Sequence, residues 1–63
     1  MTTFKRVSKE FIDLQEKIAN LERFFATTKF NALSDTQRVL LIVQKDAMET
    51  YATCLNERIN NWK

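Results

Sequence analysis

The 63-residue sequence contains no glycine, no proline and no histidine, and it has a single cysteine. At average usage a chain of this length would hold about four glycines and three prolines, the residues on which tight turns depend. Their absence argues against an all-β fold, because hairpin turns need them. The sequence therefore predicts a small helical protein of one domain.

The missing residue types also limit the chemistry available to the chain. Histidine is the usual general base and the commonest metal ligand in proteins. One cysteine, Cys54, can make neither an intramolecular disulfide nor a cysteine-based zinc site. We therefore predict a protein that is not an enzyme and uses no metal or cofactor. Cys54 lies among apolar residues, and we interpret it as a small core residue rather than a reactive thiol.

Charge and hydropathy limit the cellular location that we expect for the protein. Ten Lys and Arg stand against eight Asp and Glu, a net charge of +2. No apolar run approaches the ~18 residues of a membrane span, and the first residues lack the apolar segment of a signal peptide. We expect a cytoplasmic protein with no membrane partner.

A small basic cluster near the N-terminus, Lys5, Arg6 and Lys9, is the candidate contact for nucleic acid. Three charges supply at most a weak and steeply salt-dependent attraction to DNA. Glu10 and Asp13 follow closely, which favours a solvated helix face. Nucleic-acid binding is therefore the alternative hypothesis rather than the leading one.

Apolar residues in the first part of the chain recur in alternating steps of three and four. This spacing is the heptad seam of a helix that packs along a partner helix, and it predicts a helix over about residues 4–26. The seam residues are Phe4, Val7, Phe11, Leu14, Ile18, Leu21 and Phe25. A weaker edge of the same helix carries Ile12, Ala19 and Ala26, spaced by sevens.

A connection is expected over residues 27–34, where adjacent β-branched threonines weaken the helix. We interpret Phe30 and Leu33 as a plug for the open end of a helical hairpin. The connection ends in a capping-box motif, Ser34 with Gln37 three residues later. This motif starts a second helix over about residues 35–61.

The second helix carries two apolar stripes. One has Leu41, Met48, Leu55 and Trp62 at spacings of seven, and the other consists of Leu40, Val43, Ala47 and Cys54. Together they are wider than the ~100° arc that one partner helix covers. Gln44 falls inside this arc, either as a buried residue that fixes register or at the rim.

We therefore expect an all-α, two-helix antiparallel hairpin that pairs with a second copy to form a four-helix bundle. A larger oligomer, or a different protein on the same stripe, satisfies the same physics. The expected interface residues are Leu40, Val43, Ala47, Cys54, Ile12 and Ala19.

Two aromatic residues are candidate anchors for a protein partner. Phe24 lies off the seam, and Trp62 is the next-to-last residue. Trp62 is either a cap over the end of the bundle or an exposed anchor.

The segment from Phe30 to Ile59, together with the total length, resembles the small early proteins that lambdoid bacteriophages encode between their exonuclease and excisionase genes. The resemblance implies an accessory, non-structural protein. That gene region is associated with the lysis–lysogeny balance, with prophage induction and with interference in host cell-cycle or replication control. The apolar residues outside the hairpin seam predict a protein that acts by binding a host or phage protein through a helix face. The resemblance implies that the setting is the cytoplasm of an infected bacterium.

Overall fold

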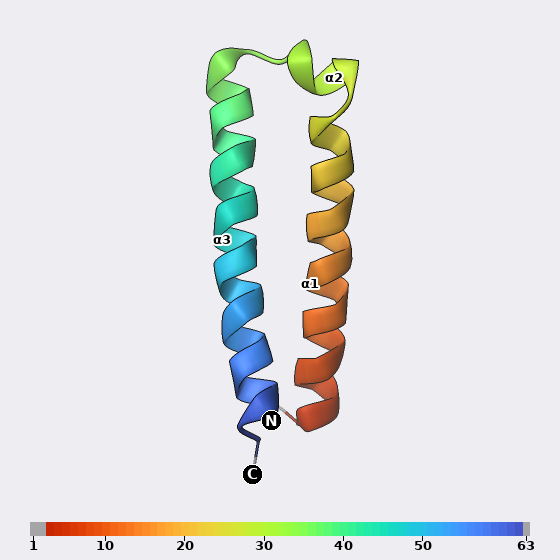
Figure 1. The fold of residues 1–63 in the computed structure, drawn as a ribbon, viewed down its shortest axis with the longest axis vertical. Coiled ribbons are helices and arrows are strands. Elements are labelled where there is room, and N and C mark those ends of the chain that lie inside the picture. The colour runs from red at the N-terminus through yellow and green to blue at the C-terminus, as the bar shows by residue number, and fades with distance from the viewer. Residues whose placement is uncertain (1–2, 63) are drawn as a thin grey trace.

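The computed structural model describes residues 3–62 as an antiparallel helical hairpin. Helix α1 spans Phe4–Phe25, the short helix α2 spans Thr28–Asn31, and α3 spans Asp35–Asn60. The two long helices run side by side, and their free ends lie at the same end of the hairpin (Figure 1). The residues that the structure describes form no strand, so the predicted all-α class is confirmed.

The heptad seam of α1 makes the contact with α3. Val7 and Leu14 of α1 are buried against Ala52 and Leu55 of α3. Leu55 lies at the centre of this core with an exposed fraction of 0%. Partly buried hydrophobic residues extend the core along both helices: Phe11, Ile18, Met48 and Ile59. The predicted seam is therefore the contact inside the hairpin.

The connection contains a short helix that we did not predict. The Thr27 hydroxyl caps α2 by accepting a hydrogen bond from the Phe30 N–H at 3.2 Å, and it donates to the Phe24 carbonyl at 2.7 Å. One hydroxyl thus joins the last turn of α1 to the first turn of α2. Phe30 is buried against the Phe25 ring, with centroids 4.8 Å apart, and it closes this end of the hairpin as expected.

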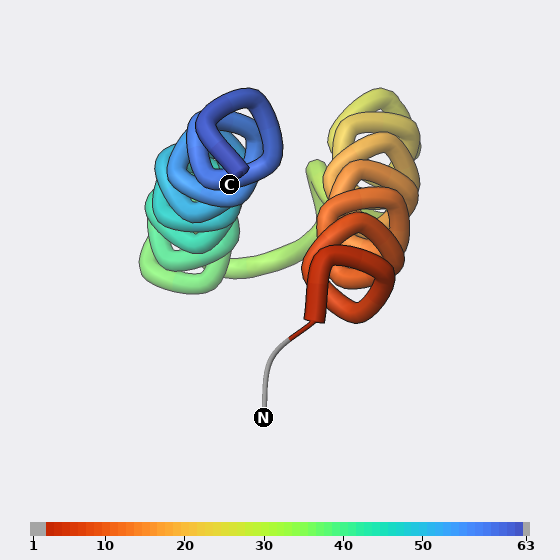
Figure 2. The backbone as a smooth tube through the Cα atoms, turned by 90° about the horizontal axis from the view of Figure 1, so that it is seen from below, coloured from red at the N-terminus to blue at the C-terminus, as the bar shows by residue number. Residues whose placement is uncertain are grey.

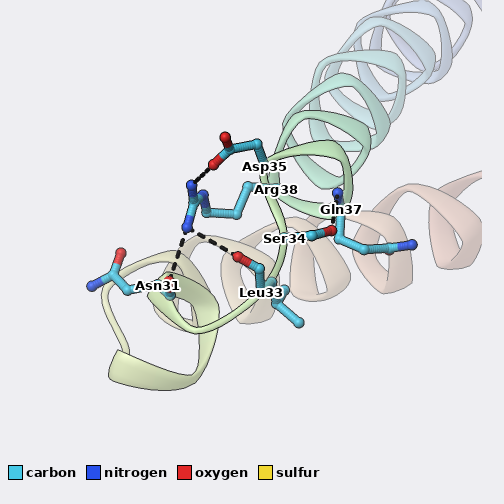
Figure 3. A network of polar contacts seen from close by, with 6 residues as sticks. All are labelled: Asn31, Leu33, Ser34, Asp35, Gln37 and Arg38. Carbon is cyan, nitrogen blue, oxygen red and sulfur yellow. Dashed lines mark hydrogen bonds and ion pairs between the residues drawn. The ribbon is translucent and has the colours of Figure 1, made fainter.

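Two side chains fix the start of α3. The Ser34 hydroxyl accepts a hydrogen bond from the Gln37 N–H at 3.2 Å, which confirms the predicted cap. The Arg38 guanidinium donates to the carbonyls of Asn31 at 2.9 Å and Leu33 at 3.0 Å, and it pairs with Asp35 (Figure 3). Because Asn31 ends α2 and Leu33 lies in the loop after it, Arg38 ties the connection to the first turn of α3.

The molecule is long and thin. Its principal extents are 46 × 18 × 15 Å and its radius of gyration is 14.4 Å. A compact chain of this length has a radius of gyration of about 10.6 Å. Seen along the hairpin, the long helices α1 and α3 lie side by side, joined by the connection at one end (Figure 2). Each long helix therefore covers one side of its neighbour and leaves its outer sides uncovered.

Candidate interaction surface

Large apolar side chains gather without cover on the first turns of α3. Val39 is 57% exposed, Leu40 55%, Ile42 45% and Val43 56%. They belong to five consecutive apolar residues, and consecutive residues point around the whole circumference of a helix. Of the five, Leu41 faces the hairpin and is partly buried. This segment of α3 therefore presents apolar surface on its outer sides.

The stripe expected to form an interface continues from there along α3. Leu40, Val43, Ala47 and Cys54 are all exposed in the hairpin. The interpretation of Cys54 as a small core residue is wrong, because its thiol lies on the outside of α3. Cys54 lies seven and fourteen residues after Ala47 and Leu40, so the three share one side of α3. Helix α1 does not cover that side, and all three are exposed.

The structure does not bring the expected α1 residues to this stripe. Ile12 is 61% exposed, and Ala19 is partly buried in a groove that Glu49 and Thr53 line from α3. Ala47 and Cys54 are helical neighbours of Tyr51, four residues before it and three residues after it. Tyr51 and Lys17 together line a groove on the other side of the α1–α3 contact. The expected six-residue interface therefore splits into two sets on opposite sides of the hairpin.

Gln44 and the aromatic candidates also have defined places. Gln44 is exposed at the rim of a groove with Phe24, so it does not lie in the hairpin core. Phe24 is half-buried, and its ring meets Phe30 edge-on with centroids 5.9 Å apart. Trp62 meets Phe4 edge-on at 5.5 Å. Trp62 thus packs on Phe4 at the open end of the helix pair and stays 39% exposed, so the cap and the exposed anchor both remain predictions.

The basic cluster is interleaved with acids. Lys9 Nζ lies 3.4 Å from Asp13 Oδ2, and both side chains are exposed. Arg6 lines a groove together with Glu10 and Asp13, and Lys5 is exposed. An electropositive stripe would need several cations without nearby carboxylates. The geometry of Lys5, Arg6 and Lys9 therefore resembles a solvated helix face.

A side-chain hydrogen bond joins the two long helices. The Tyr51 hydroxyl donates a hydrogen bond to the Glu10 carboxylate. This bond raises the pKa of Tyr51, with desolvation and the Glu10 charge acting in the same direction. On α3 itself, Lys45 Nζ pairs with Glu49 at 2.6 Å, and that bond raises the pKa of Lys45. Helix periodicity gives no signal for the Tyr51–Glu10 bond, since the residues are far apart in sequence.

A sequence model of the Sequestin family matches residues 1–61. The chain belongs to the Sequestin family. It is 38% identical over 58 residues to a 7.5 kDa protein of the denB-rIIB intergenic region of Enterobacteria phage T4, which covers 92% of this chain and 91% of that protein. The chain is thus a small phage protein. No solved structure matches it.

The family match spans both long helices of this chain. Within residues 3–62, no cluster of Cys, Asp and Glu is arranged to hold a metal ion. No helix in that range is long and apolar enough to cross a membrane.

Two exposed residues of this surface, Val39 and Ile42, were missing from the predicted interface. The signal was present in the sequence, because five apolar residues in a row cannot all face one partner helix. A search for residues spaced by seven finds one narrow stripe along a helix. It therefore misses Val39 and Ile42, which are exposed apolar residues outside that stripe.

Proposed function

We propose that this Sequestin-family protein is a phage accessory protein that acts by binding other proteins, and that it pairs with a second copy of itself. The observation that carries the proposal is the exposure of Val39, Leu40, Ile42 and Val43 within two turns of α3. Apolar helix faces of this kind are the usual docking surfaces for partner helices.

The exposed area supports pairing. The chain exposes 4969 Å². A compact monomer of this mass exposes ~4,200 Å², so the hairpin carries an excess of ~700 Å². A standard interface covers about 800 Å² on each partner. One interface per chain would therefore bring the exposed surface close to that of a compact protein.

In the proposed assembly, two hairpins form a four-helix unit. Small cores of one or two helices rarely supply more than ~3–5 kcal/mol of stability, and pairing adds a second buried seam. The composition of the chain offers no disulfide within one copy as a substitute. A non-enzymatic role agrees with the same composition, which lacks histidine.

The proposed setting is the cytoplasm of the infected bacterium. The resemblance to lambdoid early proteins extends the proposal to regulation: the protein would modulate host physiology or the lysis–lysogeny balance by engaging a host or phage protein. Its residual apolar surface after pairing, on the Val39 and Ile42 side of α3, is available for that contact.

Sedimentation equilibrium of the purified protein tests the pairing. We expect the wild-type protein and Lys9→Glu to sediment as dimers, and Val43→Glu and Ala47→Glu as monomers. Lys9→Glu is the matched control, because it places the same charge on an exposed site outside α3. A wild-type protein that is a folded monomer at micromolar concentration would contradict self-association.

Affinity capture from bacterial lysate tests the regulatory role. We expect a specific protein to be retained by the wild-type bait and lost with Ile42→Glu, while Lys5→Glu retains it. A titration of duplex DNA at two salt concentrations tests the alternative. Binding at low salt that is lost in Lys9→Glu would favour a nucleic-acid regulator.

A further inference from the structure

The uncovered side of α3 carries a complete heptad seam. Thr50 completes the stripe, so that exposed residues follow one another in steps of three, four, three and four. They are Leu40, Val43, Ala47, Thr50 and Cys54. The Thr50 hydroxyl donates to the Asp46 carbonyl at 3.1 Å, so its polar group is satisfied within its own helix. The seam has the spacing of the one inside the hairpin, and it contains no charge.

The other exposed edge of α3 lacks this continuity. Ile42 is followed, at the helical neighbour positions three, four and seven residues on, by Lys45, Asp46 and Glu49. A second copy packed along that edge would bury these charges or lose contact after one turn. The uncharged seam is therefore the surface on α3 that suits a second copy.

We propose that two copies pair through this seam with their α3 helices antiparallel. In this arrangement Leu40 packs against the partner's Thr50, and Val43 packs against the partner's Ala47. Thr36, one step of four before Leu40, packs against the partner's Cys54. This inference rests on the proposed self-association and specifies its geometry.

The spacing of the seam selects this register. Reversing one helix turns its steps into four, three, four and three, so layers coincide only where a step of three faces a step of three. The step from Leu40 to Val43 then faces the step from Thr50 to Ala47 of the partner. Every layer of the seam combines a large residue with a small one or two small ones, which lets the helices approach to about 8–10 Å.

Neighbouring arrangements are worse. A shift by one heptad in one direction places Leu40 against the partner's Glu57, and a shift in the other direction leaves only a short overlap. Parallel pairing would place Leu40 against the partner's Leu40 and Ala47 against the partner's Ala47. A layer of two large residues would then be followed by a layer of two small ones, so the distance between the helices could not stay even. Asp46 lies near the axis of the proposed pair, on the flank of the helix, where water and salt screen its charge.

The native Cys54 makes the register measurable. In Thr36→Cys the new thiol would face the partner's Cys54, and oxidation with diamide would form two disulfides per dimer. Within one chain these positions are about 27 Å apart along a straight helix, so the bond can only join two copies. The matched controls are the wild-type protein and Thr36→Cys combined with Cys54→Ser.

We expect Thr36→Cys to double in mass on non-reducing electrophoresis and both controls to remain at the mass of one chain. A second pair, Leu40→Cys with Thr50→Cys in a Cys54→Ser background, should also double in mass, and it covers the case in which Thr36→Cys disturbs the helix start. Wild-type protein that crosslinks through Cys54 alone would overturn the antiparallel arrangement. A dimer by sedimentation in which neither pair crosslinks would overturn the register alone, whereas a monomer would overturn the self-association on which it rests.

Discussion

The two seams of α3 have similar sequence patterns and opposite surroundings. The inner seam places Ala52 and Leu55 against Val7 and Leu14 of α1, and these residues are buried. The outer seam, from Leu40 to Cys54, has the same alternation of steps and is exposed along its length. Periodicity marks a surface that is able to pack against a helix. Which surface packs within the chain depends on how many helices the chain has.

The two seams should therefore respond differently to truncation. Leu55→Ala should cost about 2–5 kcal/mol of the free energy of unfolding, because it leaves a cavity in the core. Leu40→Ala should change the stability of the monomer by no more than about 0.5 kcal/mol, as exposed sites do. Urea unfolding under conditions that keep the chain monomeric measures both. Equal losses would mean that the outer seam is covered within one chain.

A charge in the outer seam should act on association instead. Val43→Glu should raise the dissociation constant of the dimer at least about tenfold, which corresponds to ~1.4 kcal/mol. The carboxylate would lie in the contact without a partner charge. Dilution series by sedimentation or fluorescence anisotropy give the constant. The melting temperature of the wild-type protein should also rise with protein concentration, and that of Val43→Glu should not.

The cap at Ser34 lies outside both seams and should have an intermediate effect. Ser34→Ala removes the acceptor for the Gln37 N–H and should lower stability by about 1 kcal/mol. Ser34→Asp, which keeps an acceptor at the cap, is the matched control and should keep most of the stability that Ser34→Ala loses. Thermal unfolding followed by circular dichroism is the measurement, and a Ser34→Ala protein as stable as wild type would contradict the role of the cap.

The smallest effect is expected at the contact between Tyr51 and Glu10. The folded-state pKa of Tyr51 is raised above its ordinary value of 10.0, so its contribution to stability is complete below pH ~10 and is lost as pH rises through the folded-state pKa. An ultraviolet titration of the single tyrosine should give a midpoint above 10 that falls in Glu10→Gln. An unchanged midpoint in that variant would show that Glu10 does not hold the hydroxyl.

Much of the fold follows from the sequence alone. Steps of three and four identified the α1 seam, since a helix places such residues on one side, and Ser34 with Gln37 located the start of α3. These features depend on neighbours within a turn or two. The resemblance to phage early proteins likewise pointed to a small phage protein, which the family and the phage relative support.

Other features depended on where distant segments meet. Tyr51 meets Glu10 only when the two long helices lie together. The α2 turn, by contrast, is local, because the Thr27 hydroxyl bonds Phe24 and Phe30 three residues away on either side, and it was not predicted because adjacent β-branched threonines weaken a helix. The side on which each residue lies, like the Tyr51–Glu10 bond, was decided by how the long helices meet. Helical spacing shows that Ala19 and Ala47 each lie off the inner seam, but only the packing of α1 on α3 shows that they lie on opposite sides of the hairpin. The sequence by itself determined the helices and their apolar seams, because those are local. The tertiary structure decided which seam of α3 is covered. Each seam can pack against one partner helix, and within this chain α1 is the long helix available to α3, so one seam is covered and the other stays exposed.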